Sequence, residues 1–187
     1  MQGFQWGGSE ELWLKTAIHA LSEGVGVNVL IKKWPSDHVN IKDLRMKGAK
    51  IHYFNSTYRA KKGIVKKYFS KKSKDKDTVF GDLNMDNVDK ILVSQGNTFS
   101  AFSNTLFHDL LELNKSIYLI SEHLSDDGIP NANVRRIARK ALNNIEKFFF
   151  VSNRSLELTK RYLNTNGDNF QLVNNPVNLI NKVAIEY

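Results

Sequence analysis

The 187 residues suffice for one domain with a sizeable core, and their 41% hydrophobic content is ordinary for a globular protein. No apolar run approaches the roughly 20 residues that span a bilayer, and no charged-then-apolar leader indicates secretion. The lack of cysteine excludes disulfides, cysteine-bound zinc and thiol catalysis, and it suits a reducing cytoplasm. The net charge of +8 is concentrated in residues 57–77, which hold nine basic and two acidic side chains.

Short apolar runs alternate along the chain with longer segments of helical period, a pattern typical of an α/β domain with a mainly parallel sheet. The predicted elements, in chain order, are a helix over 9–22, a strand over 27–33, a helix over 40–47, strands over 50–54 and 90–94, a helix over 98–113, a strand over 116–121, a helix over 130–146, a strand over 148–152, a helix over 155–163 and a strand over 171–174. Residues 57–87 interrupt the alternation as a basic insertion. We predict a single domain over 1–187 with a Rossmann-like, doubly wound sheet.

Gly7, Gly8, Ser9 and Glu10 form the strongest local motif, at the start of the first predicted helix. Two glycines let backbone amides approach a ligand closely, and Ser9 is a good residue to cap the helix. Exposed amides and the positive end of the helix dipole favour a phosphate or carboxylate. The alternative is a flexible start followed by an ordinary capped helix.

Polar residues follow the strand predicted over 90–94, at its carboxyl end. Ligands of doubly wound sheets bind outside the carboxyl ends of the strands, so functional side chains are expected there. Ser94, Gln95 and Asn97 carry groups that hydrogen-bond sugar hydroxyls or phosphate. The same residues also suit an ordinary turn in which Asn97 caps the next helix.

Glu122 and His123 follow the strand predicted over 116–121. A histidine at this position could accept a proton or hydrogen-bond a sugar hydroxyl, and the alternative is a solvent-facing loop histidine. No other histidine has a partner at metal-ligand spacing, so no metal site is predicted.

The basic segment over 57–77 has two interpretations. Its lysines alternate with apolar residues in a way that suits an amphipathic helix on an anionic membrane surface, which would make the protein peripheral to a membrane. It equally suits a solvated loop. Nucleic-acid binding is not predicted, because the charge is one short run without stacking motifs elsewhere.

With these positions in hand, the chain resembles the N-terminal domain of retaining glycosyltransferases of the GT-B fold, in the family 4 class. The matching pieces lie in order along nearly the whole chain, and the first and last are the most specific. They are Gly7-Gly8-Ser9-Glu10-Glu11-Leu12-Trp13, Ala20 to Gly24 with the strand Val25 to Val29, Leu44 to Ile51, Lys90 to Gly96, Phe148 to Asn153 and Val173-Asn174-Asn175-Pro176-Val177.

The resemblance implies a transferase that moves a sugar from a nucleotide-sugar donor to an acceptor, with retention and without a metal bound by an Asp-x-Asp motif. It implies that Gly7, Gly8 and Ser9 lie beside the donor diphosphate and that His123 lies close to the donor sugar as the catalytic residue. The acceptor would meet Glu10, Glu122 and the residues that follow the 90–94 strand. The donor is a substrate, no cofactor is implied, and the choice between UDP and GDP is left open.

Two pieces of the family pattern do not match this sequence. The family's first strand precedes the glycine loop, where only Met1 to Trp6 stand, and its loss would expose a hydrogen-bonding edge on each neighbouring strand. No two glutamates lie eight residues apart, so the Glu-x7-Glu element of the second domain is missing as well. We therefore expect a chain that does not catalyse transfer alone: a truncated fragment, a degenerate remnant, or one part of a split enzyme whose C-terminal domain is a separate chain.

Two other hypotheses stay open. One is a non-catalytic α/β module that binds a glycan, a lipid head group or a partner protein. The other is a nucleotide-binding domain with unrelated chemistry.

Overall fold

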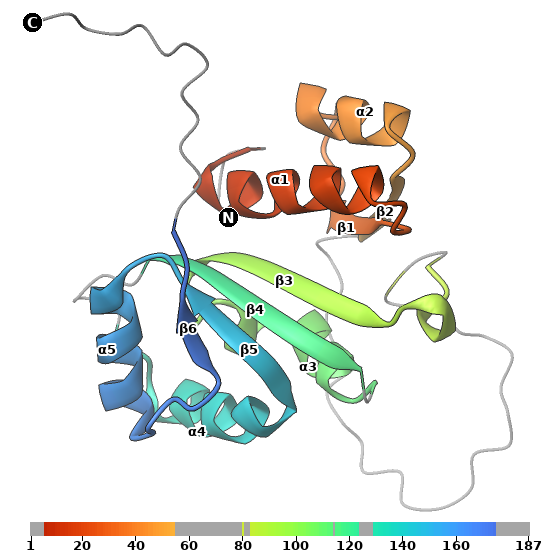
Figure 1. The fold of residues 1–187 in the computed structure, drawn as a ribbon. Coiled ribbons are helices and arrows are strands. Elements are labelled where there is room, and N and C mark those ends of the chain that lie inside the picture. The colour runs from red at the N-terminus through yellow and green to blue at the C-terminus, as the bar shows by residue number, and fades with distance from the viewer. Residues whose placement is uncertain (1–5, 55–79, 81–82, 114, 124–128, 175–187) are drawn as a thin grey trace, which may run out of the picture.

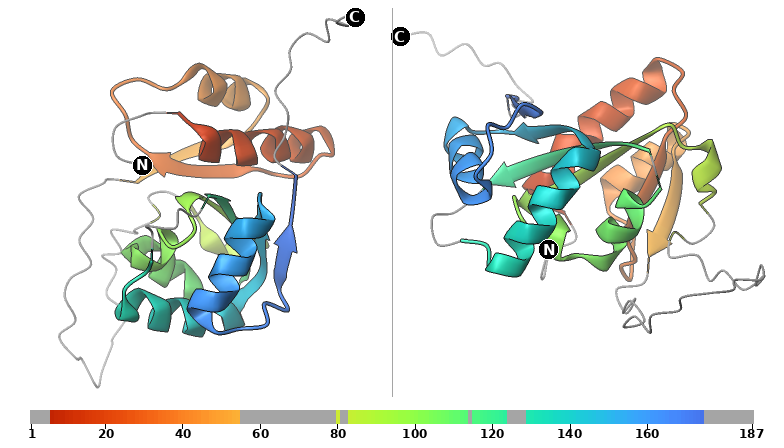
Figure 2. Two further views of the ribbon diagram at one scale, coloured as in Figure 1. Left: turned by 90° about the vertical axis from the view of Figure 1, so that its left-hand side faces the viewer. Right: turned by 90° about the horizontal axis from the view of Figure 1, so that it is seen from below.

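In the part of the chain that the structure describes, six strands form two parallel sheets between two groups of helices (Figure 1). The computed structural model describes residues 6–54, 80, 83–113, 115–123 and 129–174, and of His123 only the backbone. Helices α1 (Gly8–Ser22) and α2 (Val39–Met46) lie on one side of the strands (Figure 2). Helices α3 (Thr105–Leu111), α4 (Ala132–Ala141) and α5 (Asn153–Leu163) lie on the other. The predicted α/β class with parallel strands is confirmed.

The strands fall into a pair and a group of four. Strands β1 (Asn28–Lys32) and β2 (Lys50–Phe54) make the two-stranded sheet. The four-stranded sheet has the order β3 (Lys90–Asn97), β4 (Ser116–His123), β5 (Ile145–Phe150) and β6 (Phe170–Leu172). Because every pairing is parallel, the carboxyl ends of neighbouring strands lie at the same edge of each sheet.

The four-stranded sheet packs on an aromatic core. Phe148 and Phe150 alternate with Phe149 along β5, so both point to the same face, where their rings stack with centroids 4.3 Å apart. Phe102 meets Phe148 from the other layer, with centroids 6.3 Å apart. Leu119 of β4 is fully buried in the same cluster. Each such side chain contributes about 1.5–3 kcal/mol on burial, so this cluster holds α3, α4 and α5 to the sheet.

A smaller core joins α1 and α2 to the two-stranded sheet. Leu14 and Ala17 of α1 pack with Val29 of β1 and with Ile41 and Leu44 of α2. The first turn of α1 also reaches the other sheet, because the Ser94 hydroxyl donates to the Ser9 carbonyl oxygen at 2.6 Å. Helix α1 is therefore the element that connects the two sheets.

Two predicted helices are shorter than expected, because asparagine caps fix their starts and a 3₁₀ turn ends the second of them early. The helix predicted over 98–113 is a short 3₁₀ turn, η2 (Ala101–Ser103), followed by α3, which begins where Asn104 Oδ1 accepts the Leu106 amide at 2.9 Å. Helix α4 begins after Asn131, whose Oδ1 accepts the Val134 amide at 2.9 Å. It ends in the 3₁₀ turn η3 (Leu142–Asn144), so β5 begins three residues earlier than predicted.

Strand β2 has its predicted bounds, and most other boundaries differ by a few residues. Strands β3 and β4 run to Asn97 and His123, beyond their predicted ends, and a 3₁₀ turn, η1 (Met85–Asn87), precedes β3. The basic segment over 57–77 and the Asn175-Pro176 element lie outside the described residues. Within the described ranges, no helix is long and apolar enough to cross a bilayer.

Candidate functional site

Helix α1 begins at Gly8, with Gly7 as its N-cap residue, and not at Ser9. Gly7 has extended backbone angles and its carbonyl oxygen accepts the amides of Glu10 and Glu11, at 3.1 and 3.2 Å. The prediction that Ser9 caps the helix is wrong, because Ser9 lies inside the first turn. Its buried hydroxyl donates to Glu10 Oε2 at 3.0 Å. The glycine start leaves the amino end of α1 without a side-chain cap.

Glu122 lies against this first turn. Its half-buried carboxylate occupies the space where a side chain at Gly8 would stand, so a β-carbon there would overlap Glu122 Oε1. A β-carbon at Gly96 would lie 3.7 Å from Glu122 Oε2. Gly8 therefore leaves the room for this carboxylate at the amino end of α1, whereas a side chain at Gly96 would touch it only at an ordinary contact distance. The sequence motif contained Gly8, but neither its contact with Glu122 nor the place of Gly96 has a sequence signal.

Glu10 is the second acidic group at the site. Burial raises the pKa of Glu10 above its ordinary value, and the hydrogen bond from Ser9 acts in the opposite direction. Carboxylates with perturbed pKa values cluster at functional sites, although structural networks produce them too. Because the carboxylates of Glu10 and Glu122 both lie near the amino end of α1, this end of the helix is rich in hydrogen-bond acceptors.

The polar residues after Val93 bind mainly to the protein itself. Ser94 donates to the Ser9 carbonyl oxygen, and Gln95 is buried with its amide bonded to the Thr98 carbonyl oxygen and the Ala101 amide, both at 2.7 Å. Asn97 Oδ1 accepts the Phe99 amide at 3.0 Å, which makes a local turn and not the cap of α3. Gln95 and Asn97 thus shape the loop at the carboxyl end of β3, and Ser94 ties α1 to this strand.

A hydroxyl pair under the site was not predicted. Thr98 Oγ1 and Ser121 Oγ lie 2.7 Å apart, and both side chains are fully buried. Each hydroxyl therefore satisfies the other where water cannot reach. The pair ties the loop after β3 to β4, one residue before Glu122.

The backbone of His123 lies at the same edge. In the register of β3 and β4, His123 is paired with Asn97, so it ends β4 beside the loop that carries the polar residues. The side chain of His123 is outside the described atoms, so the role predicted for it stays a prediction.

Trp6 makes an aromatic contact beside the first turn of α1 that the sequence did not indicate. Its ring stacks on His38, with centroids 4.5 Å apart and planes at 10°, and its Nε1 donates to Glu11 Oε1 at 2.5 Å. His38 also caps α2 by accepting the Asn40 amide at 3.3 Å. Trp6 thereby links the start of α1 to the loop that follows β1.

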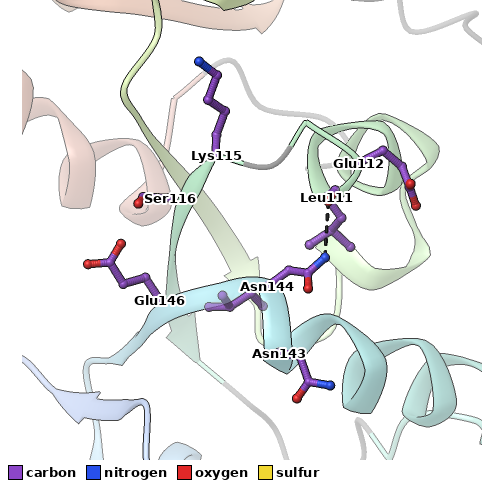
Figure 3. A pocket seen from close by; sticks show the side chains of 8 residues that line it. Leu111, Glu112, Lys115, Ser116, Asn143, Asn144 and Glu146 are labelled. Carbon is purple, nitrogen blue, oxygen red and sulfur yellow. Dashed lines mark hydrogen bonds between the residues drawn. The ribbon is translucent and has the colours of Figure 1, made fainter.

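A separate hollow of about 430 Å³ lies at the opposite end of the sheet (Figure 3). It is lined by the amino ends of β4 and β5 and the end of α3, where Asn144 Nδ2 donates to the Leu111 carbonyl oxygen at 3.3 Å. Beside it, the Tyr118 hydroxyl donates to Glu146 and lowers the pKa of Glu146. Ligands of parallel α/β sheets bind at the carboxyl ends, so this hollow is not the candidate site.

Comparison of the chain with protein-family models, with curated proteins and with solved structures finds no match.

Proposed function

We propose that this chain is the acceptor-side, N-terminal domain of a GT-B-fold glycosyltransferase, with a Rossmann-like sheet, that works together with a separate donor-binding domain. The motif resemblance supports the class, and the parallel sheets with helices on both sides suit it. One observation carries the proposal for the site. The Glu122 carboxylate, at the carboxyl end of β4, lies between Gly8 and Gly96 at the amino end of α1.

This arrangement suits a ligand with both phosphate and hydroxyl groups. The amino end of α1 presents backbone amides and a positive dipole, which favour the donor diphosphate. Glu10 and Glu122 accept hydrogen bonds, which sugar hydroxyls donate. His123, at the end of β4, would stand closest to the transferred sugar by resemblance. The domain would orient donor and acceptor, and the second domain would supply most contacts to the nucleotide.

A non-catalytic glycan-binding module is the second candidate, and one observation favours it. The side chains of Ser94, Gln95 and Asn97 are engaged in contacts within the chain. Glu10 and Glu122 are then the main polar side chains near the first turn of α1 that could contact a ligand. Two carboxylates repel a diphosphate but accept hydrogen bonds from a neutral sugar.

Titration of the chain with UDP-sugars, GDP-sugars, free sugars and nicotinamide cofactors separates these functions. We expect nucleotide-sugar binding that Glu122→Gln weakens by about tenfold or more, because a charge-assisted hydrogen bond contributes about 1.5–3 kcal/mol. Gly8→Val should weaken it as well, because the valine side chain would enter the space of the Glu122 carboxylate. Glu112→Gln, at the opposite end of the sheet, is the matched control and should bind like the parent chain.

Other outcomes contradict the transferase proposal. Binding of free sugars without nucleotide sugars, weakened by Glu122→Gln, supports the glycan-binding module. Binding of nicotinamide cofactors alone indicates unrelated nucleotide chemistry. Circular dichroism of each variant shows whether lost binding reflects lost folding.

A further inference from the structure

The loop between α5 and β6 carries the Asn-Gly step Asn166-Gly167, which occurs once in the sequence (Figure 1). Asn166 is exposed, so water reaches its side-chain amide. Asparagine is a thermolabile residue, because the backbone nitrogen of the residue that follows can attack its side-chain carbon. Glycine has no side chain that hinders this approach. The loop therefore places an exposed asparagine in the setting that favours the attack.

The fold requires glycine at position 167. Gly167 has a φ of +70°, in the left-handed region where other residues are strained. A β-carbon there would lie 2.7 Å from the Phe170 ring and 3.0 Å from Lys160 Cε, so a larger residue would also overlap its neighbours. The Asn-Gly step is thus a consequence of how the chain turns from α5 into β6, because the turn tolerates no other residue after Asn166.

One hydrogen bond restrains the backbone nitrogen of Gly167. Its amide donates to Thr165 Oγ1 at 3.2 Å, which is the long end of the range for such bonds. The nitrogen must leave this hydroxyl before it can attack the Asn166 side chain. Gly167 is also buried, so the attack needs a local opening of the loop. The Thr165 hydroxyl therefore opposes the reaction that the dipeptide favours.

We propose that Asn166 is a deamidation site and that Thr165 slows its conversion by holding the Gly167 amide. The Gly167 backbone nitrogen loses its proton and forms a bond to Asn166 Cγ, and the side-chain nitrogen leaves with that proton as ammonia. Water then opens the succinimide ring at either of its two carbonyl carbons, which gives aspartate or isoaspartate. Water is the co-reactant, and no atom is oxidised or reduced. The inference rests on this loop and does not depend on sugar transfer.

The two products differ in what they do to β6. The Gly167 carbonyl oxygen accepts the Phe170 amide at 2.8 Å, and the Asn169 carbonyl oxygen accepts the Phe148 amide at 2.9 Å. These bonds hold the three-residue strand β6 beside β5. Isoaspartate adds one methylene to the backbone before Gly167, so it displaces this turn and loosens β6. Aspartate adds a charge but keeps the length of the backbone.

The first test incubates the full chain in mildly alkaline buffer and follows its asparagines by peptide mass spectrometry. We expect Asn166 to convert faster than Asn164, which is exposed in the same loop but is followed by a threonine. Thr165→Ala should speed the conversion of Asn166 about two- to tenfold, the range that corresponds to one lost hydrogen bond. Thr165→Ser keeps the hydroxyl, and it should convert like the parent chain. Circular dichroism shows whether both variants fold.

The second test compares amide exchange in the two products. We expect faster exchange of the Phe148 and Phe170 amides in the isoaspartate form, separated by chromatography. Asn166→Asp, which adds the charge without the methylene, is the matched control and should exchange like the parent chain. Conversion of Asn164 before Asn166, or equal rates in the parent and Thr165→Ala, would overturn the proposal. Unchanged exchange in the isoaspartate form would overturn the effect on β6. No sugar or nucleotide is present, so these outcomes are independent of the proposed function.

Discussion

The four-stranded and the two-stranded sheets differ in the amount of core that supports them. Among the described residues, fourteen buried hydrophobic side chains form the cluster under β3 to β6, and five of these are phenylalanines. The cluster around β1 and β2 has six. Two strands alone are marginally stable in water, so the smaller unit depends on α1 and α2 for its cover. We infer that β1 and β2 open more readily than β4 and β5, because local stability follows the number of buried apolar contacts.

The largest expected effect is in the aromatic core. Phe148→Ala removes a fully buried ring that contacts Phe102, Phe150 and Phe170, and it should lower the free energy of unfolding by about 3–5 kcal/mol. Denaturant unfolding followed by circular dichroism measures this loss. Phe149→Ala, a half-buried ring on the opposite face of β5, is the matched control and should cost less. Equal losses would contradict the assignment of the larger core to the Phe148 face.

The next effect tests the smaller core. Leu44→Ala empties a fully buried position in α2 and should cost about 2–4 kcal/mol within the β1–β2 unit. Amide exchange in 28–32 and 50–54 should become faster, while exchange in β4 stays unchanged. Met46→Ala, at an 80% exposed site in the same helix, should change neither region. Faster exchange throughout the described strands would show that the two units unfold together.

A smaller loss is expected at the buried hydroxyl pair. Thr98→Val keeps the shape but leaves the Ser121 hydroxyl without its partner, which should lower the free energy of unfolding by about 1–3 kcal/mol. Thr98→Ser retains the hydroxyl and should lose less. Denaturant midpoints of the parent chain and the two variants give the comparison. If Thr98→Val is as stable as the parent chain, the hydrogen bond between Thr98 and Ser121 does not stabilise the fold.

The smallest effect concerns Glu10, in the helix that joins the two units. Burial raises the pKa of Glu10, so its ionised form costs free energy in the folded state. Below the pKa of Glu10 in the unfolded chain, about 4.3, the side chain is protonated in both states and this cost is absent. Above the raised pKa of the folded state, the cost is complete. Glu10→Gln should therefore be more stable than the parent at pH 7, with the difference vanishing as the pH falls below 4. Melting temperatures between pH 3 and pH 8 test this, with Glu23→Gln as an exposed control, and a destabilised variant at pH 7 would contradict it.

Much of the fold could be predicted from the sequence, because parallel strands and amphipathic helices have distinct periods. Lys50–Phe54 was predicted with its observed bounds, since alternating apolar residues end there at a polar cluster. Helix boundaries near Asn104 and Asn131 were missed, because several polar residues in those loops are capable of capping and only the fold selects one. The split into two sheets has no sequence signal, since each strand looks the same whether it has one neighbour or two.

The candidate site was predicted in part. The convergence of the glycine turn with the ends of two strands follows from their places in the chain. The contact between Gly8 and Glu122 joins residues more than a hundred positions apart, and only the packing of α1 on β3 and β4 produces it. The sequence left both a ligand contact and a turn open for Gln95, and its buried hydrogen bond to the Thr98 carbonyl oxygen decides for the turn.

The register that pairs Asn97 with His123 makes β3 and β4 end level with each other. Neighbouring strands stand about 4.8 Å apart, so the backbone groups of these two last residues lie side by side at one edge of the sheet. The chain therefore leaves β3 and β4 at the same height, and a residue displaced at the end of one strand would disturb the end of the other.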